Sequence, residues 1–411
     1  MELKDDAYRV QGLSLIDLAN TFGTPLYVYD ASVIESQVKK MKHAFYGLNL
    51  CIKFAVKALS NLSILKLMKK LGTGLDVVSI EEAYLGIKAG FDPRDILYTP
   101  NSVSFEEIKE AVKLGIKINI DNISILEQFG HEFRDSIPVC IRINPHILAG
   151  GNLNISTGHI DSKFGISIMQ LRHAERVIQS NHMRISGLHM HTGSDILDTE
   201  AFVEAINILF DVAKQFKDLE FIDFGSGFKI AYREGDVTTD VNTLGKRLIK
   251  AFRNFTKEYG KEIAVWFEPG KYLVSEAGLL LVRANVIKTT PASVFVGVNS
   301  GLNHLIRPMM YNAYHEIINI SNLHGPKRIY TVVGYICETD TLGSDRKLTE
   351  VKEGDILSIK NAGAYGFSMS SNYNSRLRPA EVMIINGEAR LIRKAESLED
   401  ILKNMIEIDI E

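Results

Sequence analysis

Polar side chains that can do chemistry stand at the ends of short apolar runs in this sequence. The first is Lys57, which follows the apolar run 51–56. A lysine at the end of a buried strand is poorly solvated, which lowers its pKa and favours the nucleophilic free amine. The structural alternative is a lysine whose charged end reaches water from the strand end. The sequence thus indicates a candidate nucleophile at Lys57.

Two histidines stand near the end of a later run. His189 and His191 are two residues apart, so they lie on the same face of a predicted strand. This spacing suits two metal ligands, but no third histidine or cysteine follows in register, and we expect no metal. A histidine ring can also stack on a planar cofactor, or one of the two can fill the core. Both alternatives stay open on the spacing alone.

Two loops with possible ligand-binding chemistry follow the last two apolar runs. The small residues Gly225, Ser226 and Gly227 would let a phosphate approach backbone N–H groups. Glu268, which precedes Pro269 and Gly270, could hold a cationic ring nitrogen. An ordinary glycine turn, and a helix cap or salt bridge, are the structural alternatives.

The elements that must position these residues alternate between strands and helices. Apolar runs are followed by segments of helical period, and a helix over 31–45 precedes the first run. Eight such strands predict a (β/α)₈ barrel of the TIM type, whose active site lies at the carboxyl ends of the strands. A doubly wound open sheet is the alternative. The eight runs are 51–56, 75–78, 96–98, 117–120, 138–143, 184–190, 220–224 and 263–267.

The pattern changes after about residue 278. Strand-like runs separated by turn residues such as Asn386-Gly387 predict a mostly β domain. The segment 25–29 near the N-terminus is a further strand that we expect to join it. The predicted domains are therefore a barrel over 30–278 and a β domain made of 1–29 and 279–411. The strand-like runs are 279–286, 293–298, 329–335 and 381–385.

The composition excludes several classes of protein. The chain has 411 residues, of which 45% are hydrophobic and 24% charged, which is typical of a globular protein. A net charge of −3 offers no basic excess for nucleic acid. Three cysteines cannot form a disulfide framework, and no apolar run is long enough to span a membrane. With no signal peptide apparent, we expect a cytoplasmic location.

These residues, together with further motifs in the same order along the chain, resemble the diaminopimelate decarboxylases. That family belongs to the pyridoxal phosphate (PLP) enzymes with an alanine-racemase-like barrel, and ornithine decarboxylase is a relative. The resemblance runs from about residue 23 to 379. The matching motifs are FAVKA (54–58), LDVVS (75–79), RINP (142–145), DSKFGI (161–166), GLHMHTGS (187–194), DFGSG (223–227), EPG (268–270), NHLIRP (303–308), CE (337–338), GAY (363–365) and SNYN (371–374).

The resemblance implies a PLP site in the barrel. Lys57 would be the Schiff-base lysine, His191 would stack on the cofactor ring, and Glu268 would pair with the pyridine nitrogen. The phosphate would be held by residues from several segments, namely Ser194, Gly225, Ser226, Gly227, Glu268, Pro269, Gly270, Lys271 and Tyr365.

The resemblance also implies a homodimer with shared active sites. Cys337 would enter from the partner subunit as the proton donor, and Glu338 beside it would meet the distal ammonium of the substrate. Arg307 and Tyr311 would bind the distal carboxylate, because a guanidinium offers a bidentate fork. Lys271 and Tyr365 would complete the substrate site.

The implied reaction is PLP-dependent decarboxylation of meso-2,6-diaminopimelate to L-lysine and CO₂, the last step of lysine biosynthesis. Two positions depart from the family pattern: Ser226 replaces a glycine, and Lys271 replaces an arginine that offers a second fork. The alternatives are a decarboxylase for ornithine, a D-amino acid or a carrier-linked acid, an amino-acid racemase, a non-catalytic PLP carrier and a metal-dependent barrel aldolase. Arg307 favours a substrate with a distal carboxylate, and the extra β domain argues against a lone-barrel carrier.

Overall fold

The computed structural model describes residues 1–147, 158, 160–193 and 199–410. The chain divides into two compact units. The barrel unit consists of Ser36–Ala231 and Asp236–Leu273, and the β unit consists of Met1–Glu35, Tyr232–Gly235 and Val274–Glu411. The β unit therefore receives segments from three places in the sequence.

The barrel unit is built on eight parallel strands that close on themselves. Val265 of the last strand pairs with Leu50 of the first, so the sheet has no open edge between them. The predicted barrel is confirmed, and the open doubly wound sheet is wrong. In order around the barrel the strands are β5 (Leu50–Ala55), β6 (Gly74–Val77), β7 (Ile96–Tyr98), β8 (Lys117–Ile120), β9 (Val139–Asn144), β11 (Ile185–His189), β12 (Phe221–Asp223) and β13 (Ala264–Phe267), and β10 (Ile166–Ser167) pairs with β9.

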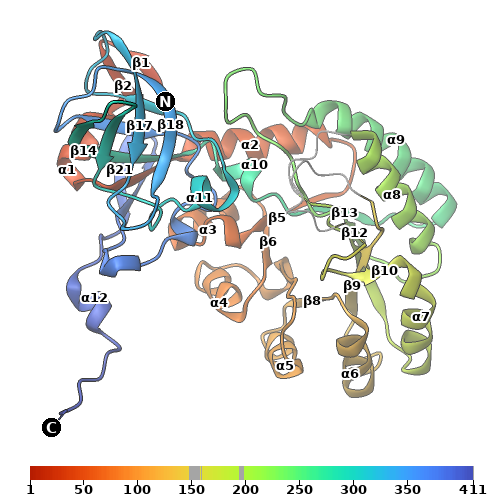
Figure 1. Cartoon of the computed structure of the whole chain (residues 1–411). Coiled ribbons are helices and arrows are strands. Elements are labelled where there is room, and N and C mark those ends of the chain that lie inside the picture. Colours follow the sequence, from red (N-terminus) through yellow and green to blue (C-terminus); the bar gives the residue numbers. More distant parts are fainter. Residues whose placement is uncertain (148–157, 159, 194–198, 411) are drawn as a thin grey trace. The chain divides into compact units, whose positions relative to one another are not determined.

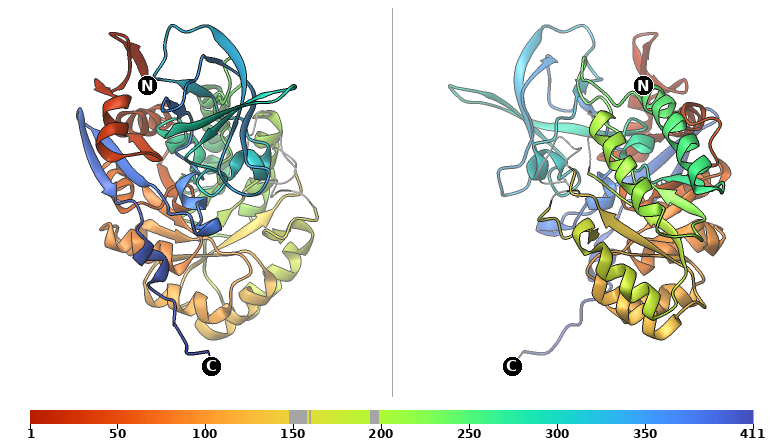
Figure 2. Two further views of the ribbon diagram at one scale, coloured as in Figure 1. Left: turned by 60° about the vertical axis from the view of Figure 1, so that its left-hand side comes forward. Right: turned by 90° about the vertical axis from the view of Figure 1, so that its right-hand side faces the viewer.

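Helices lie on the outside of these strands (Figures 1 and 2). Several of these helices begin directly after a strand, at a residue whose side chain accepts a hydrogen bond from a free N–H group of the first turn. Ser79 accepts the N–H of Glu82, and Asn122 accepts that of Ile125. The helices are α2 (Ala31–Ala44), which precedes β5, and α3 (Leu62–Lys70), α4 (Ile80–Lys88), α5 (Phe105–Lys113), α6 (Ile123–Phe133), α7 (Leu171–Ser180), α8 (Thr199–Ala213), α9 (Val241–Tyr259) and α10 (Lys271–Val274).

One core layer of the barrel unit is built around two stacked aromatic rings. Trp266 on β13 stacks on Phe221 of the neighbouring β12 with ring centroids 3.6 Å apart. Gly187 on β11 leaves room for the Phe221 ring, because a Cβ there would lie 2.2 Å from a ring carbon. Lys53 is 1% exposed; its Nζ donates to the carbonyl of Asp95 and lies 4.3 Å from the Trp266 ring centre. The stacked rings thus carry a buried cation against one face.

The β unit contains a second, mostly antiparallel sheet. Strand β4, from the N-terminal segment, pairs with β14 and with β20, which confirms that this segment joins the β domain. The order is β18 (Thr341–Thr349), β17 (Lys327–Val333), β15 (Val294–Val298), β14 (Gly278–Thr289), β4 (Leu26–Asp30), β20 (Ala380–Ile385) and β21 (Glu388–Arg393), with β19 (Ile356–Ile359) pairing β14 and β16 (Ile317–Asn319).

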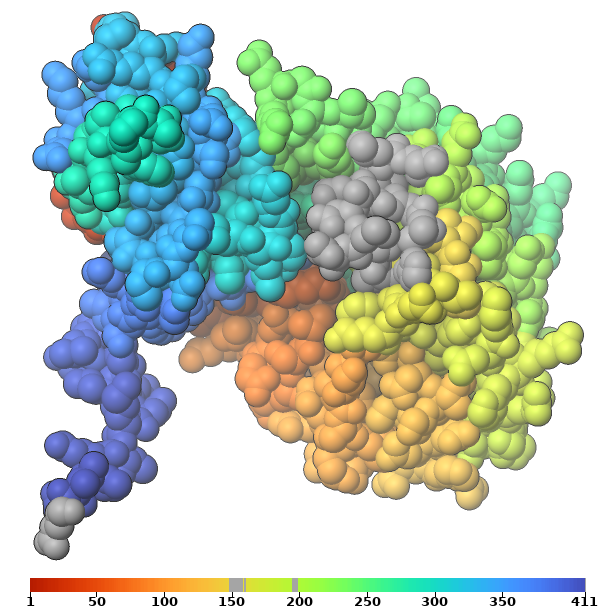
Figure 3. Space-filling view, viewed as in Figure 1, coloured from red at the N-terminus to blue at the C-terminus, as the bar shows by residue number. Residues whose placement is uncertain are grey.

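Smaller elements complete the β unit. A three-stranded sheet of β1 (Glu2–Lys4), β2 (Ala7–Val10) and β3 (Leu13–Ser14) precedes α1 (Leu15–Phe22), and α11 (Arg307–Tyr311) and α12 (Leu398–Leu402) come later. After α12 the chain is irregular; this last segment has the dark blue end of the colour scale in Figure 3. It exposes apolar side chains such as Ile406, which is 88% exposed. None of the helices that the structure describes is long and apolar enough to cross a membrane.

Candidate active site

Six charged or titratable residues gather at the carboxyl ends of the barrel strands. Lys57 lies in the 3₁₀ turn η1 (Val56–Ala58) that follows β5, and Glu268 directly follows β13. The other four lie on strands β6, β9, β11 and β12 and are Asp76, Arg142, His189 and Asp223. Because parallel strands end at one face of a barrel, the fold brings together groups that are up to 211 positions apart in the sequence.

Lys57 and Asp76 form the first pair of this site. The Lys57 Nζ lies 3.9 Å from Asp76 Oδ2, and the two side chains are 44% and 1% exposed. The Lys57 side chain is thus less withdrawn from water than its place after an apolar run predicts. Burial and the nearby Glu268 raise the pKa of Asp76 to about 7, while the Lys57 charge acts in the opposite direction. Asp76 is therefore half-protonated near neutral pH.

Glu268 and His189 form the second pair. Glu268 Oε2 lies 3.0 Å from His189 Nε2, and both side chains are buried. Burial and the Arg142 charge hold the pKa of His189 well below its usual value, so the neutral ring donates its N–H to the carboxylate. Burial also raises the pKa of Glu268, and the charges of Lys57 and Arg142 oppose that rise.

The loop at 225–227 requires glycine at two of its three positions. Gly225 has a φ of 61°, and a Cβ there would lie 2.6 Å from His191 Nδ1 and 2.7 Å from the Met190 carbonyl. Only glycine fits at this position. Ser226 donates its backbone N–H to His191 Nδ1 over 3.2 Å, which ties the predicted stacking histidine to the loop. Gly227 has a φ of 125°, so glycine is required there as well.

The barrel site fits a cofactor with a cationic ring nitrogen and an anionic group. Several buried polar atoms have no hydrogen-bond partner within the described residues, including Nδ1 of His189 and Oδ1 of Asp76. Buried polar groups normally have a partner, so these atoms indicate a ligand. A primary amine, a small-residue loop and a buried carboxylate are the groups that hold PLP.

Arg307, Tyr311 and Tyr365 come together in the β unit, as the resemblance implies. The guanidinium carbon of Arg307 lies 6.0 Å from the Tyr311 ring centre and 5.9 Å from that of Tyr365. Its Nη2 donates to the Tyr232 hydroxyl over 3.2 Å. Arg307 is buried, and its Nε has no partner among the residues that the structure covers. Tyr232 was missed from the sequence, because no motif surrounds it.

Cys337 and Glu338 form another group in the β unit, on an exposed turn. Asn374 donates from Nδ2 to the Cys337 sulfur over 3.2 Å, and the Tyr373 hydroxyl donates to Glu338 Oε1 over 2.9 Å. The two sequence motifs 337–338 and 371–374 are thus in contact with each other. A half-exposed tyrosine thereby orients the carboxylate predicted to meet the substrate ammonium.

Of the remaining predicted residues, three lie in the part of the chain that the structure describes and one does not. Pro269 and Gly270 are buried directly after Glu268, and Lys271 begins α10. The Pro269 carbonyl accepts the N–H of Ala55, which fixes this loop to β5. Ser194 lies outside the described residues. The site also contains three residues for which no role was predicted, namely Asp76, Arg142 and Asp223. Their position at the ends of strands was the feature of the sequence that indicated them.

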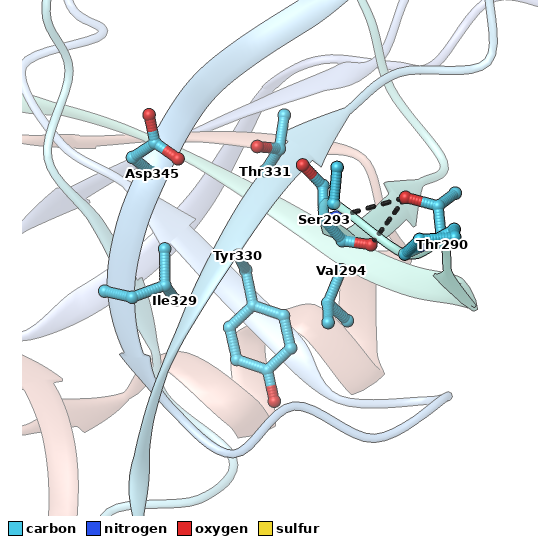
Figure 4. Close-up of a pocket in the computed structure, with 9 residues that line it drawn as sticks. Thr290, Ser293, Val294, Ile329, Tyr330, Thr331 and Asp345 are labelled. Carbon is cyan, nitrogen blue, oxygen red and sulfur yellow. Dashed lines mark hydrogen bonds between the residues drawn. The ribbon is translucent and has the colours of Figure 1, made fainter.

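A surface pocket in the β unit offers no comparable chemistry. It lies beside the turn between β14 and β15 and is lined by the residues of Figure 4, including Thr290, Ser293 and Asp345. Thr290 and Ser293 hydrogen-bond to each other there. The pocket contains none of the predicted site residues, so it is not the candidate active site.

Comparison with known proteins agrees with this geometry. Residues 31–275 match the family described as pyridoxal-dependent decarboxylase, pyridoxal binding domain. The fold and the site thus define a PLP-dependent decarboxylase with a barrel. Diaminopimelate decarboxylases from Methanothermobacter thermautotrophicus and Bacillus subtilis are each 37% identical to the chain, covering 96% of it and 94% of their own length. The chain belongs to the diaminopimelate decarboxylase family, whose members are carboxy-lyases.

Solved structures agree over the whole chain. The crystal structure of the diaminopimelate decarboxylase from M. jannaschii has a TM-score of 0.91 at 32% identity and covers 99% of this chain and 98% of its own. That from Helicobacter pylori, complexed with L-lysine, has a TM-score of 0.86 at 34% identity and covers 94% and 98%. The lysine/ornithine decarboxylase from Vibrio vulnificus, at 21% identity and a TM-score of 0.79, shares the fold.

Proposed function

We propose that this chain decarboxylates meso-2,6-diaminopimelate to L-lysine and CO₂ with PLP as its cofactor. The observation that carries the proposal is the barrel site, where a lysine amine, a buried carboxylate and a glycine-dependent loop end neighbouring strands. Full-length relatives of this name support the substrate. The alternative substrates, such as ornithine, lack the second carboxylate that Arg307 suits.

Each barrel residue has a role that its contacts support. Bound PLP supplies an electron sink for the pair of electrons left when CO₂ departs. Lys57 holds the cofactor through its amine, and the loop at 225–227 with residues 269–271 binds its phosphate. His191 would stack on the ring of the bound cofactor. Glu268 keeps the ring nitrogen protonated, and it is oriented for this by the hydrogen bond from His189.

The β unit supplies the groups that bind the distal end of the substrate and donate the proton. Arg307, held by Tyr232, binds the distal carboxylate with Tyr311 nearby. Cys337 delivers the proton to the α-carbon, and Glu338 receives the distal ammonium; both residues are exposed, as groups that act on a ligand from outside their own unit must be. We propose that they do so across a homodimer, with functional domains at 30–278 and at 1–29 with 279–411. The low cysteine count supports a cytoplasmic location.

The decisive experiment supplies PLP and a panel of amino acids to the purified protein. Release of CO₂ with formation of lysine from meso-diaminopimelate, and no turnover of ornithine, would support the proposal. The Lys57→Ala protein serves as the blank. Turnover of ornithine or a D-amino acid in place of diaminopimelate would contradict it.

The shared site has its own test. Lys57→Ala and Cys337→Ala homodimers should each be severely impaired, and a reassociated equal mixture should regain activity. Random pairing makes half of the dimers mixed, and each mixed C₂ dimer has one intact site, so recovery should reach about a quarter of wild type. No recovery, once subunit exchange has been verified by mass, would place both residues in one chain's site.

A further inference from the structure

Asp223 is a fully buried carboxyl group beside Glu268 that the proposed mechanism does not use. It ends β12, and its side chain is 0% exposed. Its Oδ1 accepts the backbone N–H of Gly225 over 2.8 Å, so one oxygen is fixed by the phosphate loop. Its Oδ2 has no partner among the described residues, and neither has Glu268 Oε1. One oxygen of the Asp223 carboxyl group, one of the Glu268 carboxyl group and one ring nitrogen of His189 all lie within 4.8 Å of one another.

Ionising both of two buried carboxyl groups that lie so close together is strongly unfavourable, so one of them keeps a proton. The surrounding charges decide which one keeps the proton. Lys57 and Arg142 are the leading charges that favour an ionised Glu268, whereas Asp223 has only the Gly225 N–H and the more weakly acting Lys53. Burial, and after it the neighbouring Glu268 charge, raise the pKa of Asp223 well above its usual value. The titratable and charged groups that act on the pair are Asp76, His189, Arg142, Lys57 and Lys53.

We infer that Asp223 is a positioning residue that stays protonated and donates its Oδ2 hydrogen to the Glu268 carboxylate. Glu268 then receives two hydrogen bonds, one from Asp223 and one from His189, and remains an anion directed at the cofactor ring. Asp223 also connects the phosphate loop to this carboxylate, because its other oxygen holds the Gly225 N–H. The inference rests on the proposed role of Glu268, and it goes beyond it by assigning the proton of the pair.

The test compares an amide with a deletion at the same position. Asp223→Asn keeps an acceptor for the Gly225 N–H and a donor toward Glu268, so it mimics the protonated acid. Asp223→Ala loses both. We expect the amide variant to keep a PLP affinity near that of wild type, and the alanine variant to bind PLP about 10- to 100-fold more weakly, as expected for a lost hydrogen bond to a charged group. Asp240→Asn, which changes an exposed helix cap, is the matched control and should leave PLP binding unchanged.

A second measurement observes the proton directly and requires no catalysis. Infrared spectroscopy detects the carbonyl stretch of a protonated carboxyl group. Besides Asp223 and Glu268, the carboxyl groups of Asp76 and Glu82 in the barrel unit also have raised pKa values, each of about 7. Both residues are unchanged in the Asp223→Asn protein, so their bands cancel in the wild-type minus Asp223→Asn difference spectrum, which should retain one protonated-carboxyl band.

The outcomes separate this inference from the proposed function. If Asp223→Asn loses PLP affinity as severely as Asp223→Ala, or if no protonated-carboxyl band is present, Asp223 is ionised and the inference is wrong. Wild-type PLP binding by both variants would show that Asp223 positions nothing. If the wild-type protein fails to decarboxylate diaminopimelate while these PLP and infrared results hold, only the proposed substrate is wrong.

Discussion

Replacing Asp76 by asparagine should change how the stability of the cofactor-free protein depends on pH. The folded-state pKa of Asp76 is raised from 3.8 to about 7, mainly because its side chain is buried. The folded protein therefore keeps a proton at this position at pH values where the unfolded chain has lost it. The stability that this proton contributes is complete below about pH 4 and is lost as the pH rises through about 7.

The magnitude follows from the two pKa values. A difference of about 3 units corresponds to about 4 kcal/mol of unfolding free energy. Asparagine has the shape of the protonated acid and does not titrate. The Asp76→Asn protein should thus match wild type near pH 4 and exceed it by up to about 4 kcal/mol at about pH 8.

The assay is urea unfolding of both cofactor-free proteins, followed by circular dichroism at several pH values between about 4 and 8. Glu82 also has a raised pKa of about 7, so a pH dependence will remain in the variant. Only the difference between the two proteins isolates Asp76. If that difference stays constant across the pH range, burial of Asp76 does not shift its titration and the reasoning fails.

Three further predictions concern the proposed chemistry. Lys57→Ala should abolish covalent attachment of PLP, and borohydride reduction with peptide mapping of wild type should find the label on Lys57 and nowhere else. Glu268→Gln should still bind PLP but decarboxylate far more slowly, since a neutral amide cannot keep the ring nitrogen protonated; a turnover number near that of wild type would assign this task to another group. Arg307→Lys should lose about 1.5–3 kcal/mol in kcat/KM for diaminopimelate with PLP binding intact, because a bidentate pair to a carboxylate is lost; unchanged kcat/KM would mean that Arg307 does not read the distal carboxylate.

Periodicity was sufficient to predict the barrel. The predicted runs 96–98 and 117–120 coincide with β7 and β8, and the other barrel strands differ from their predicted runs by one residue at one or both ends. The signal is strong because a closed parallel sheet buries both faces of each strand, so the runs are nearly continuously apolar. The strand at Leu26–Asp30 was also predictable, although its pairing between β14 and β20 depends on residues more than 240 positions away.

The sequence pattern could not predict which charged side chains of the site lie close to one another. Sequence position places Asp223 and Glu268 at two strand ends, but it does not give the orientation of either side chain. Their shared burial follows only from the register of β12 and β13. Lys57 lies in the 3₁₀ turn after β5 with its side chain 44% exposed, which agrees with the alternative that the sequence left open, a lysine whose charged end reaches water. Tyr232 reaches Arg307 from a segment that the sequence assigns to the barrel.

The fluorescence of Trp266, the residue that stacks on Phe221, allows the unfolding of one unit of this protein to be followed separately from the other. Trp266 is the single tryptophan of the chain, and it lies in the barrel unit. Indole emission excited selectively over tyrosine therefore reports the barrel alone, and the β unit contributes nothing to it. The buried ammonium of Lys53 beside the ring should make this emission sensitive to loss of the barrel core. Comparing it with circular dichroism of the whole chain would reveal whether the two units unfold together or one after the other.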